Sequence, residues 1–143
     1  MTGKRTWLAA VLVGCGGGAP TAPTPARAPA SDAISLSSMT PAPGTLLHAR
    51  EMVTFTATVS YTLASAASGQ IVIVIQDQLN QNLKPPGVAQ SAVSVMTGTS
   101  TTTLSDSIRI PDSGVSSVRV FLLLSPAGTT RTDVVVSVSY PVS

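Results

Sequence analysis

The segment from Met52 to Leu63 constrains the fold more than any other part of the chain. Six apolar residues alternate there with five hydroxyl residues, which are Thr54, Thr56, Thr58, Ser60 and Thr62. Side chains of a β-strand point alternately to two faces, so this pattern turns one apolar face toward a core and one hydroxyl face outward. On a helix the same residues would scatter around the circumference. The segment therefore predicts a half-buried β-strand.

Further segments have the length and composition of strands. They are rich in Val, Ile and Leu, are separated by Pro-, Gly- and Ser-containing breaks, and span 33–38, 71–75, 92–96, 104–110, 118–124 and 134–140. The break 125–128, Ser-Pro-Ala-Gly, has Pro and Gly at the positions that a type I turn favours, which predicts a hairpin of the last two strands. The predicted fold is all-β, an immunoglobulin-like sandwich of about seven antiparallel strands.

The beginning of the chain has the arrangement of a secretory signal. Lys4 and Arg5 precede an apolar run at 7–13, as the positive region of a signal peptide precedes its apolar region. The run ends in Leu12-Val13-Gly14-Cys15, which resembles the lipobox of bacterial lipoproteins. The resemblance implies that residues 1–14 are removed as a signal peptide and that Cys15 carries the acyl chains that anchor the protein in a membrane.

Cys15 is the only cysteine of the chain, so it cannot form an intramolecular disulfide, and a metal cluster is not expected. An exported protein with one thiol needs an explanation, and lipidation supplies it; the alternative is a chance cysteine beside a signal anchor. Gly16 follows the cysteine. In the lipoprotein family, Asp at that position retains the protein at the inner membrane, so Gly16 favours the outer membrane, with the domain on its periplasmic or surface face.

Residues 15–32 are expected to form a linker between the lipid anchor and the domain. The segment is rich in Gly, Ala, Pro and Thr and has no hydrophobic period. Such a composition cannot bury a core and favours extended polyproline II structure, which would hold the domain away from the lipid. The domain is expected to span 33–143. Its first strand, Pro-Gly break at 41–44 and long strand ending in Tyr61 resemble bacterial immunoglobulin-like envelope domains, although those often have a Gly where this chain has Arg50-Glu51.

The charge composition weighs against nucleic acid as a partner. Without residues 1–14, six basic residues balance six acidic ones, so the electrostatic footprint of a nucleic-acid-binding protein is missing. No apolar run approaches the roughly 20 residues of a membrane-spanning helix. The expected partners are the membrane, through the lipid anchor, and an unidentified envelope protein or glycan.

No residue pattern predicts a catalytic, cofactor-binding or metal site. His48, the only histidine, is interpreted as an exposed loop residue near Glu51; a Ser-His-Asp triad stays open, although the chain has no Gly-x-Ser-x-Gly elbow. Asp106 falls on the apolar phase of its strand, either as a buried, paired acid or as an edge-strand device against aggregation, and we favour the edge device. The polar loop 76–82 concentrates oxygen and amide groups suited to calcium or sugar, but it lacks the spacing of a calcium loop and is interpreted as a solvated connection.

These features predict a non-catalytic lipoprotein of the bacterial cell envelope that presents an immunoglobulin-like interaction or structural module. The alternatives are a carbohydrate- or ligand-binding β-sandwich and a hydrolase built on a sandwich scaffold. Carbohydrate-binding surfaces usually expose an aromatic platform. Of the few aromatic residues here, only Phe121 is expected to face outward, which weighs against a sugar site.

Overall fold

The computed structural model describes residues 31–130 and 134–143, and this part of the chain contains strands and no helix. The strands pair antiparallel. In chain order they are β1 (Ala33–Thr40), β2 (Met52–Asp77), β3 (Ala92–Arg109), β4 (Ser117–Pro126) and β5 (Val135–Pro141). The predicted all-β, sandwich-like fold is confirmed. Cys15, the predicted signal peptide and most of the predicted linker lie outside the described residues.

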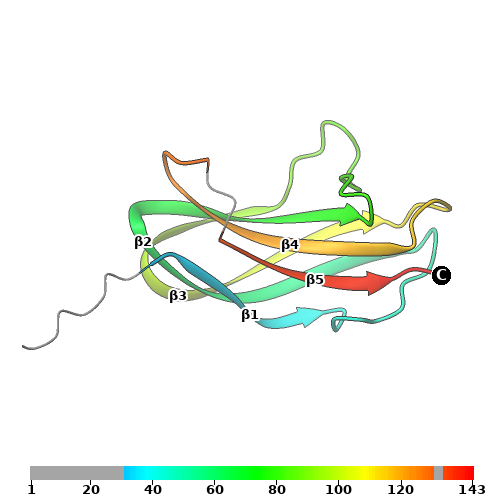
Figure 1. Ribbon diagram of the computed structural model, residues 1–143, viewed down its shortest axis with the longest axis horizontal. Helices are drawn as coiled ribbons and strands as arrows, with labels where there is room; N and C mark the ends of the chain where they lie inside the picture. Colours follow the sequence, from blue (N-terminus) through cyan, green and yellow to red (C-terminus); the bar gives the residue numbers. More distant parts are fainter. Residues whose placement is uncertain (1–30, 131–133) are drawn as a thin grey trace, which may run out of the picture.

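The two long strands, β2 and β3, each contribute to two layers because both turn back at the same end of the molecule (Figure 1). The first half of β2 pairs with β1 and with the second half of β3. Its second half pairs with the first half of β3 and with β4, which pairs in turn with β5. The expected segments 52–63 and 71–75 are thus one strand, and so are 92–96 and 104–110. The expectation of separate strands there was wrong.

The bend of β2 falls in a stretch of small residues, 64–69, where the alternation of apolar and polar residues stops. Leu63 pairs with Gly98 and Ser68 with Met96, so the intervening residues of β2 bulge against the single residue of β3 between them. Gly98 has a φ of 113°, a conformation that side-chain-bearing residues rarely adopt. Asp32 accepts hydrogen bonds from backbone N–H groups inside the bend, which satisfies donors that the bulge takes out of the ladder.

The core lies between the inward faces of the two layers. The six alternating apolar residues of the first half of β2 are at most 8% exposed, as the alternation predicts: Val53, Phe55, Ala57, Val59, Tyr61 and Leu63. The opposite layer contributes aliphatic residues at every second position, which are Ile71, Ile73, Ile75, Val118, Val120, Leu122 and Leu124. The rings of Phe55 and Tyr140 meet across the layers with centroids 5.1 Å apart. Burial of such side chains stabilises the fold by about 1.5–3 kcal/mol each.

The segment after β1 leaves the first layer and covers the C-terminal end of the outer edge of β5. Gly44 N–H donates to the carbonyl of Ser139, and Leu47 N–H donates to the carbonyl of Pro141, at 3.0 and 2.9 Å. Leu47 and Val142 form a parallel bridge. The hydroxyl of Tyr140 donates to the carbonyl of Pro41 at 2.8 Å. The two layers are therefore joined along the β1–β5 side by backbone hydrogen bonds as well as by ring packing.

We expect Phe55→Ala to lower the free energy of unfolding by about 3–5 kcal/mol, because a fully buried ring is lost from the core. Thr56→Ala should cost less than half of that, since Thr56 points to the outer face and its hydroxyl contacts Ser105. Urea unfolding of both variants measures the difference. A loss at Thr56 equal to that at Phe55 would contradict the assignment of faces.

Burial raises the pKa of Tyr140 to about 12 from an ordinary value of 10.0. A raised pKa in the folded state means that this residue's contribution to stability is complete below pH 10 and is lost as the pH rises toward 12. Tyr140→Phe keeps the ring on Phe55 but cannot ionise. We therefore expect the variant to lose less stability than the wild type over this range in chemical denaturation at stepped pH. Parallel curves would assign the alkaline loss to other groups.

Candidate interaction surface

Paired hydroxyl groups cover the outer face of the layer formed by β1, the first half of β2 and the second half of β3. Oxygen–oxygen distances of 2.8 to 3.4 Å join the pairs Thr54–Ser107, Thr56–Ser105, Thr58–Thr103, Ser60–Thr101 and Thr62–Thr99. Ser37 of β1 extends the array, with its Oγ 3.0 Å from that of Ser60. We call the five β2–β3 pairs the hydroxyl ladder. Neighbouring rungs repeat at about 6.8 Å along the strands because every second side chain shares a face.

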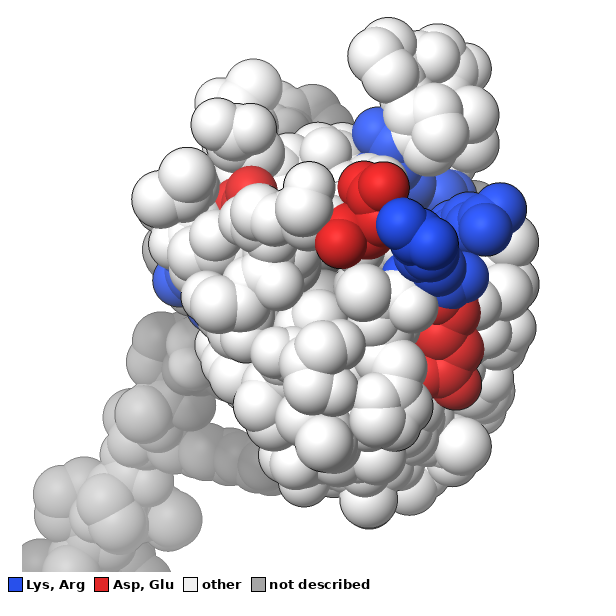
Figure 2. Space-filling model, turned by 90° about the vertical axis from the view of Figure 1, so that its right-hand side faces the viewer, with Lys and Arg blue, Asp and Glu red and all other residues white. Residues whose placement is uncertain are grey.

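The hydroxyl ladder is polar without being charged. A hydroxyl group is both a donor and an acceptor, so each pair keeps hydrogen-bonding capacity after its internal bond is made. The β3 members are all exposed, whereas most β2 members are half-buried between their neighbours. The end of the molecule opposite the bend differs, because it carries charged side chains, most of which gather toward one side of the surface in view (Figure 2). The ladder therefore suits a neutral, hydrogen-bonding partner.

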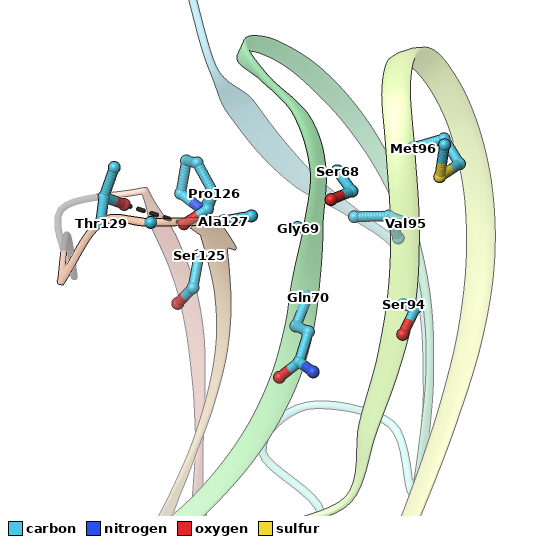
Figure 3. A pocket seen from close by; sticks show the side chains of 11 residues that line it. Ser68, Gly69, Gln70, Ser94, Val95, Met96, Ser125, Pro126, Ala127 and Thr129 are labelled. Atoms are coloured by element: carbon cyan, nitrogen blue, oxygen red, sulfur yellow. Dashed lines mark hydrogen bonds between the residues drawn. The ribbon is translucent and has the colours of Figure 1, made fainter.

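An open groove of about 380 Å³ lies beside the bend, between β2, β3 and the turn after β4 (Figure 3). Gln70 of β2 lies there between Ser94 of β3 and Ser125 of β4. Gly69 allows β2 and β4 to approach closely, since an added Cβ would lie 2.7 Å from the carbonyl oxygen of Ser125. Among the described residues, the lining is neither charged nor aromatic and offers neutral hydrogen bonds.

A buried ion pair lies on the side of the sandwich away from β5. Lys84 Nζ is 2.7 Å from Asp106 Oδ1, and the two side chains are only 7% and 5% exposed. Lys84 also donates to the carbonyl of Ala89, and Asp106 accepts from the backbone N–H of Ser91. Asp106 is thus the buried, paired acid, and the favoured interpretation as an edge device was wrong. The period of the strand directs Asp106 inward, but only the path of the 78–91 loop brings a lysine to it.

The polar loop 76–82 has oxygen groups suited to calcium or sugar, but these groups accept hydrogen bonds from other groups of the protein. Asp77 is buried, and its Oδ1 accepts two backbone N–H groups of the loop at 2.8 Å. Asn80 Oδ1 accepts from the guanidinium of Arg119 at 2.6 Å, and the Gln78 amide donates to the carbonyl of Gly114. No group of three or more His, Cys, Asp or Glu residues gathers within the described ranges. The loop therefore ties the end of β2 to β4 and to the 110–116 connection.

His48 is an exposed residue of the loop after β1 and lies beside Ser143, which follows β5. Its Nδ1 is 2.9 Å from Ser143 Oγ. Glu51 accepts from the backbone N–H of His48 and not from its ring. A histidine that activates a serine needs an acid to orient its ring, and the hydrogen bonds of the described residues give His48 none.

The outward position of Phe121 is partly covered. The ring is half-buried on the outer face of β4, and the guanidinium carbon of Arg119 lies 5.8 Å from its centroid. A cation over an aromatic face stabilises both side chains, and here it occupies a face that a sugar ring would need.

Three β3 residues of the hydroxyl ladder, Thr99, Thr101 and Thr103, were not expected to lie on a strand, because 99–103 is an uninterrupted Ser/Thr run without alternation. The high strand propensity of Thr was the one available signal.

Comparisons with known proteins identify no family. Neither a protein-family model nor a curated protein sequence matches this chain. Among solved structures, a beta-glucosidase from Listeria innocua, determined alone and in complex with isofagomine, is 16% identical with a TM-score of 0.45. The match covers 78% of this chain but only 16% of the Listeria chain. In the part of the chain that the structure describes, no helix has the length and apolarity to cross a membrane.

We expect Lys84→Met to lower the free energy of unfolding by about 3–5 kcal/mol, because Asp106 stays buried without its cation. Adding Asp106→Leu should restore most of the loss, since no unpaired charge remains. Asp112→Asn is the control: it breaks the exposed Arg50–Asp112 pair and should cost about 0–1 kcal/mol. Thermal and urea unfolding report all three. Equal losses for Lys84→Met and Asp112→Asn would show that the buried pair contributes no more than a surface pair.

Proposed function

We propose that this protein is a non-catalytic lipoprotein of the bacterial cell envelope, whose β-sandwich serves as an interaction or structural module. The observation that carries the proposal is the order of the parts: a lipobox-like run ending at Cys15, a Pro-rich spacer, and a domain whose first strand begins at Ala33. This order gives each part a role. The basic and apolar leader directs export, the single thiol receives the lipid, and the spacer holds the domain away from the membrane.

The geometry of the domain supports such a role. Ala33 pairs with Thr62, next to the bend of β2, so the first strand of the domain begins at the bend end (Figure 1). The connections 41–51, 78–91 and 110–116 lie at the other end. An anchor at Cys15 would hold the bend end toward the lipid and direct those connections away from it. A spacer residue in polyproline II conformation extends the reach by about 3.1 Å.

The described surface favours binding over chemistry. Its most regular feature is the hydroxyl ladder, which makes neutral hydrogen bonds and holds no acid, base or nucleophile poised by a neighbour. The carbohydrate-binding alternative has less support because the outward aromatic residue, Phe121, lies under Arg119.

Expression of the wild-type chain in a bacterial host should place it in the membrane fraction with a lipid mass on its N-terminal peptide. Cys15→Ser should carry no acyl mass, because serine has no thiol to receive the diacylglycerol. Fractionation with mass spectrometry of the N-terminal peptide gives both results. A wild-type protein that is soluble and carries no lipid would refute the anchor.

A further inference from the structure

The chain protects two of its sheet edges. The C-terminal end of the outer edge of β5 is covered by the segment 44–49, through hydrogen bonds that include Leu47 N–H to Pro141 O. The edge strand β1 is interrupted by a bulge between Leu36 and Ser38 and is followed by Pro41. Covered edges, bulges and prolines all hinder the addition of a further strand.

After its bend, β3 has no such protection between Thr99 and Ser105. Within the described residues it pairs with β2 along its length and with no strand on its other side. The stretch contains no charged residue and no proline, and its pairing with β2 is unbroken from Gly98 to Arg109. An open groove of about 320 Å³ separates the two halves of β3, lined by Ser91, Ala92, Val93, Thr103, Leu104 and Ser105. A regular, uncharged edge with unpaired backbone groups is a template for another strand.

We propose that β3 pairs edge to edge, in antiparallel orientation, with β3 of a second copy of this chain. Outward-pointing backbone groups and side-chain faces both alternate with period two along a strand. In a twofold antiparallel pair, a residue whose backbone groups point outward lies opposite another such residue of the second copy. The side chains of both residues then lie on the same face of the joined sheet. The hydroxyl ladder of one copy therefore runs into that of the other. Ser and Thr side chains stand opposite Ser and Thr, a favourable cross-strand pairing.

The charge distribution favours a second copy as the partner. In a twofold contact, a charged residue near the axis lies close to its own symmetry mate, and like charges in opposed positions destabilise a strand pair. The stretch 99–105 avoids this penalty because it carries no charge. The next residue, Asp106, is turned inward and bound by Lys84. A charged partner strand would meet no complementary charge along this edge.

The contact involves the domain alone and is independent of the lipid anchor, although anchoring copies in one membrane plane would raise their effective concentration. The test therefore uses the full chain with Cys15→Ser, which removes both the anchor site and the only native thiol. Absence of cross-linked dimer would leave the proposed lipoprotein function untouched. Absence of a lipid at Cys15 would likewise leave the proposed strand pairing untouched.

In that chain, a single cysteine replaces Thr99, Thr101, Thr103 or Ser105. Each variant is solubilised in mild detergent, and a short thiol-specific bismaleimide links neighbouring copies. Directly opposed side chains in an antiparallel pair have Cβ atoms about 4.5–5.5 Å apart, so the yield of covalent dimer should peak at one or two adjoining positions. Ser35→Cys on the bulged β1 edge is the matched control and should give only background. Residues 1–14 are the same in all variants, so they cannot make the yield of covalent dimer depend on the position of the cysteine.

Thr101→Lys, added to the best cross-linking variant (or Thr103→Lys where Thr101→Cys links best), should lower the dimer yield at least tenfold, on the order of a 1.4 kcal/mol change in pairing. Ser35→Lys should leave the yield unchanged, and thermal melting shows that each variant is folded. Equal yields at β3 and β1 positions, or insensitivity to Thr101→Lys, would overturn the proposal. Cross-linking to a host protein in place of a second copy would do the same. If Thr101→Lys does not fold, the positional scan alone decides.

Discussion

The structure depends on β2, which passes from one layer to the other as a single continuous strand. β1, β3 and β4 all pair with it, and β5 is joined to it through β4. Buried backbone groups must find partners, so a strand that changes layers has to keep its ladder through the bend. Small residues, the backbone freedom of Gly98 and the carboxylate of Asp32 make this possible. Both layers are therefore one sheet, and the core is the space that this sheet encloses.

A sheet that curls over on itself has two long sides where its layers must be joined, and this chain joins them by different interactions. On the β1–β5 side, the segment 44–49 adds backbone hydrogen bonds, and the rings of Phe55 and Tyr140 pack across the layers. On the other side, Lys84 reaches inward to Asp106. A buried ion pair loses much of its attraction to desolvation, so its main effect is to fix the path of the loop that carries the lysine.

The surface is polar mainly through hydroxyl groups, in a chain with only 10% charged residues. This composition has two consequences for interaction. The outer face of the β1–β2–β3 layer becomes a regular array of neutral donors and acceptors. The low content of charged residues also leaves the edge of β3 without the charges that sheet proteins commonly use against unwanted strand pairing. A domain held by a spacer at its bend end would leave both the array and this edge accessible.

Alternation within the sequence determined the all-β class, the two faces of 52–63 and the inward positions of Phe55 and Tyr140, because strand periodicity is a local property. The alternation could not show that β2 continues through 64–69, where the residues are all small. Nor could it show that 99–103 is strand, where every residue is Ser or Thr. The pairing of Lys84 with Asp106 and the hydroxyl ladder were decided only by tertiary structure. Periodicity tells which way a side chain points, but the partner it meets depends on how distant segments pair.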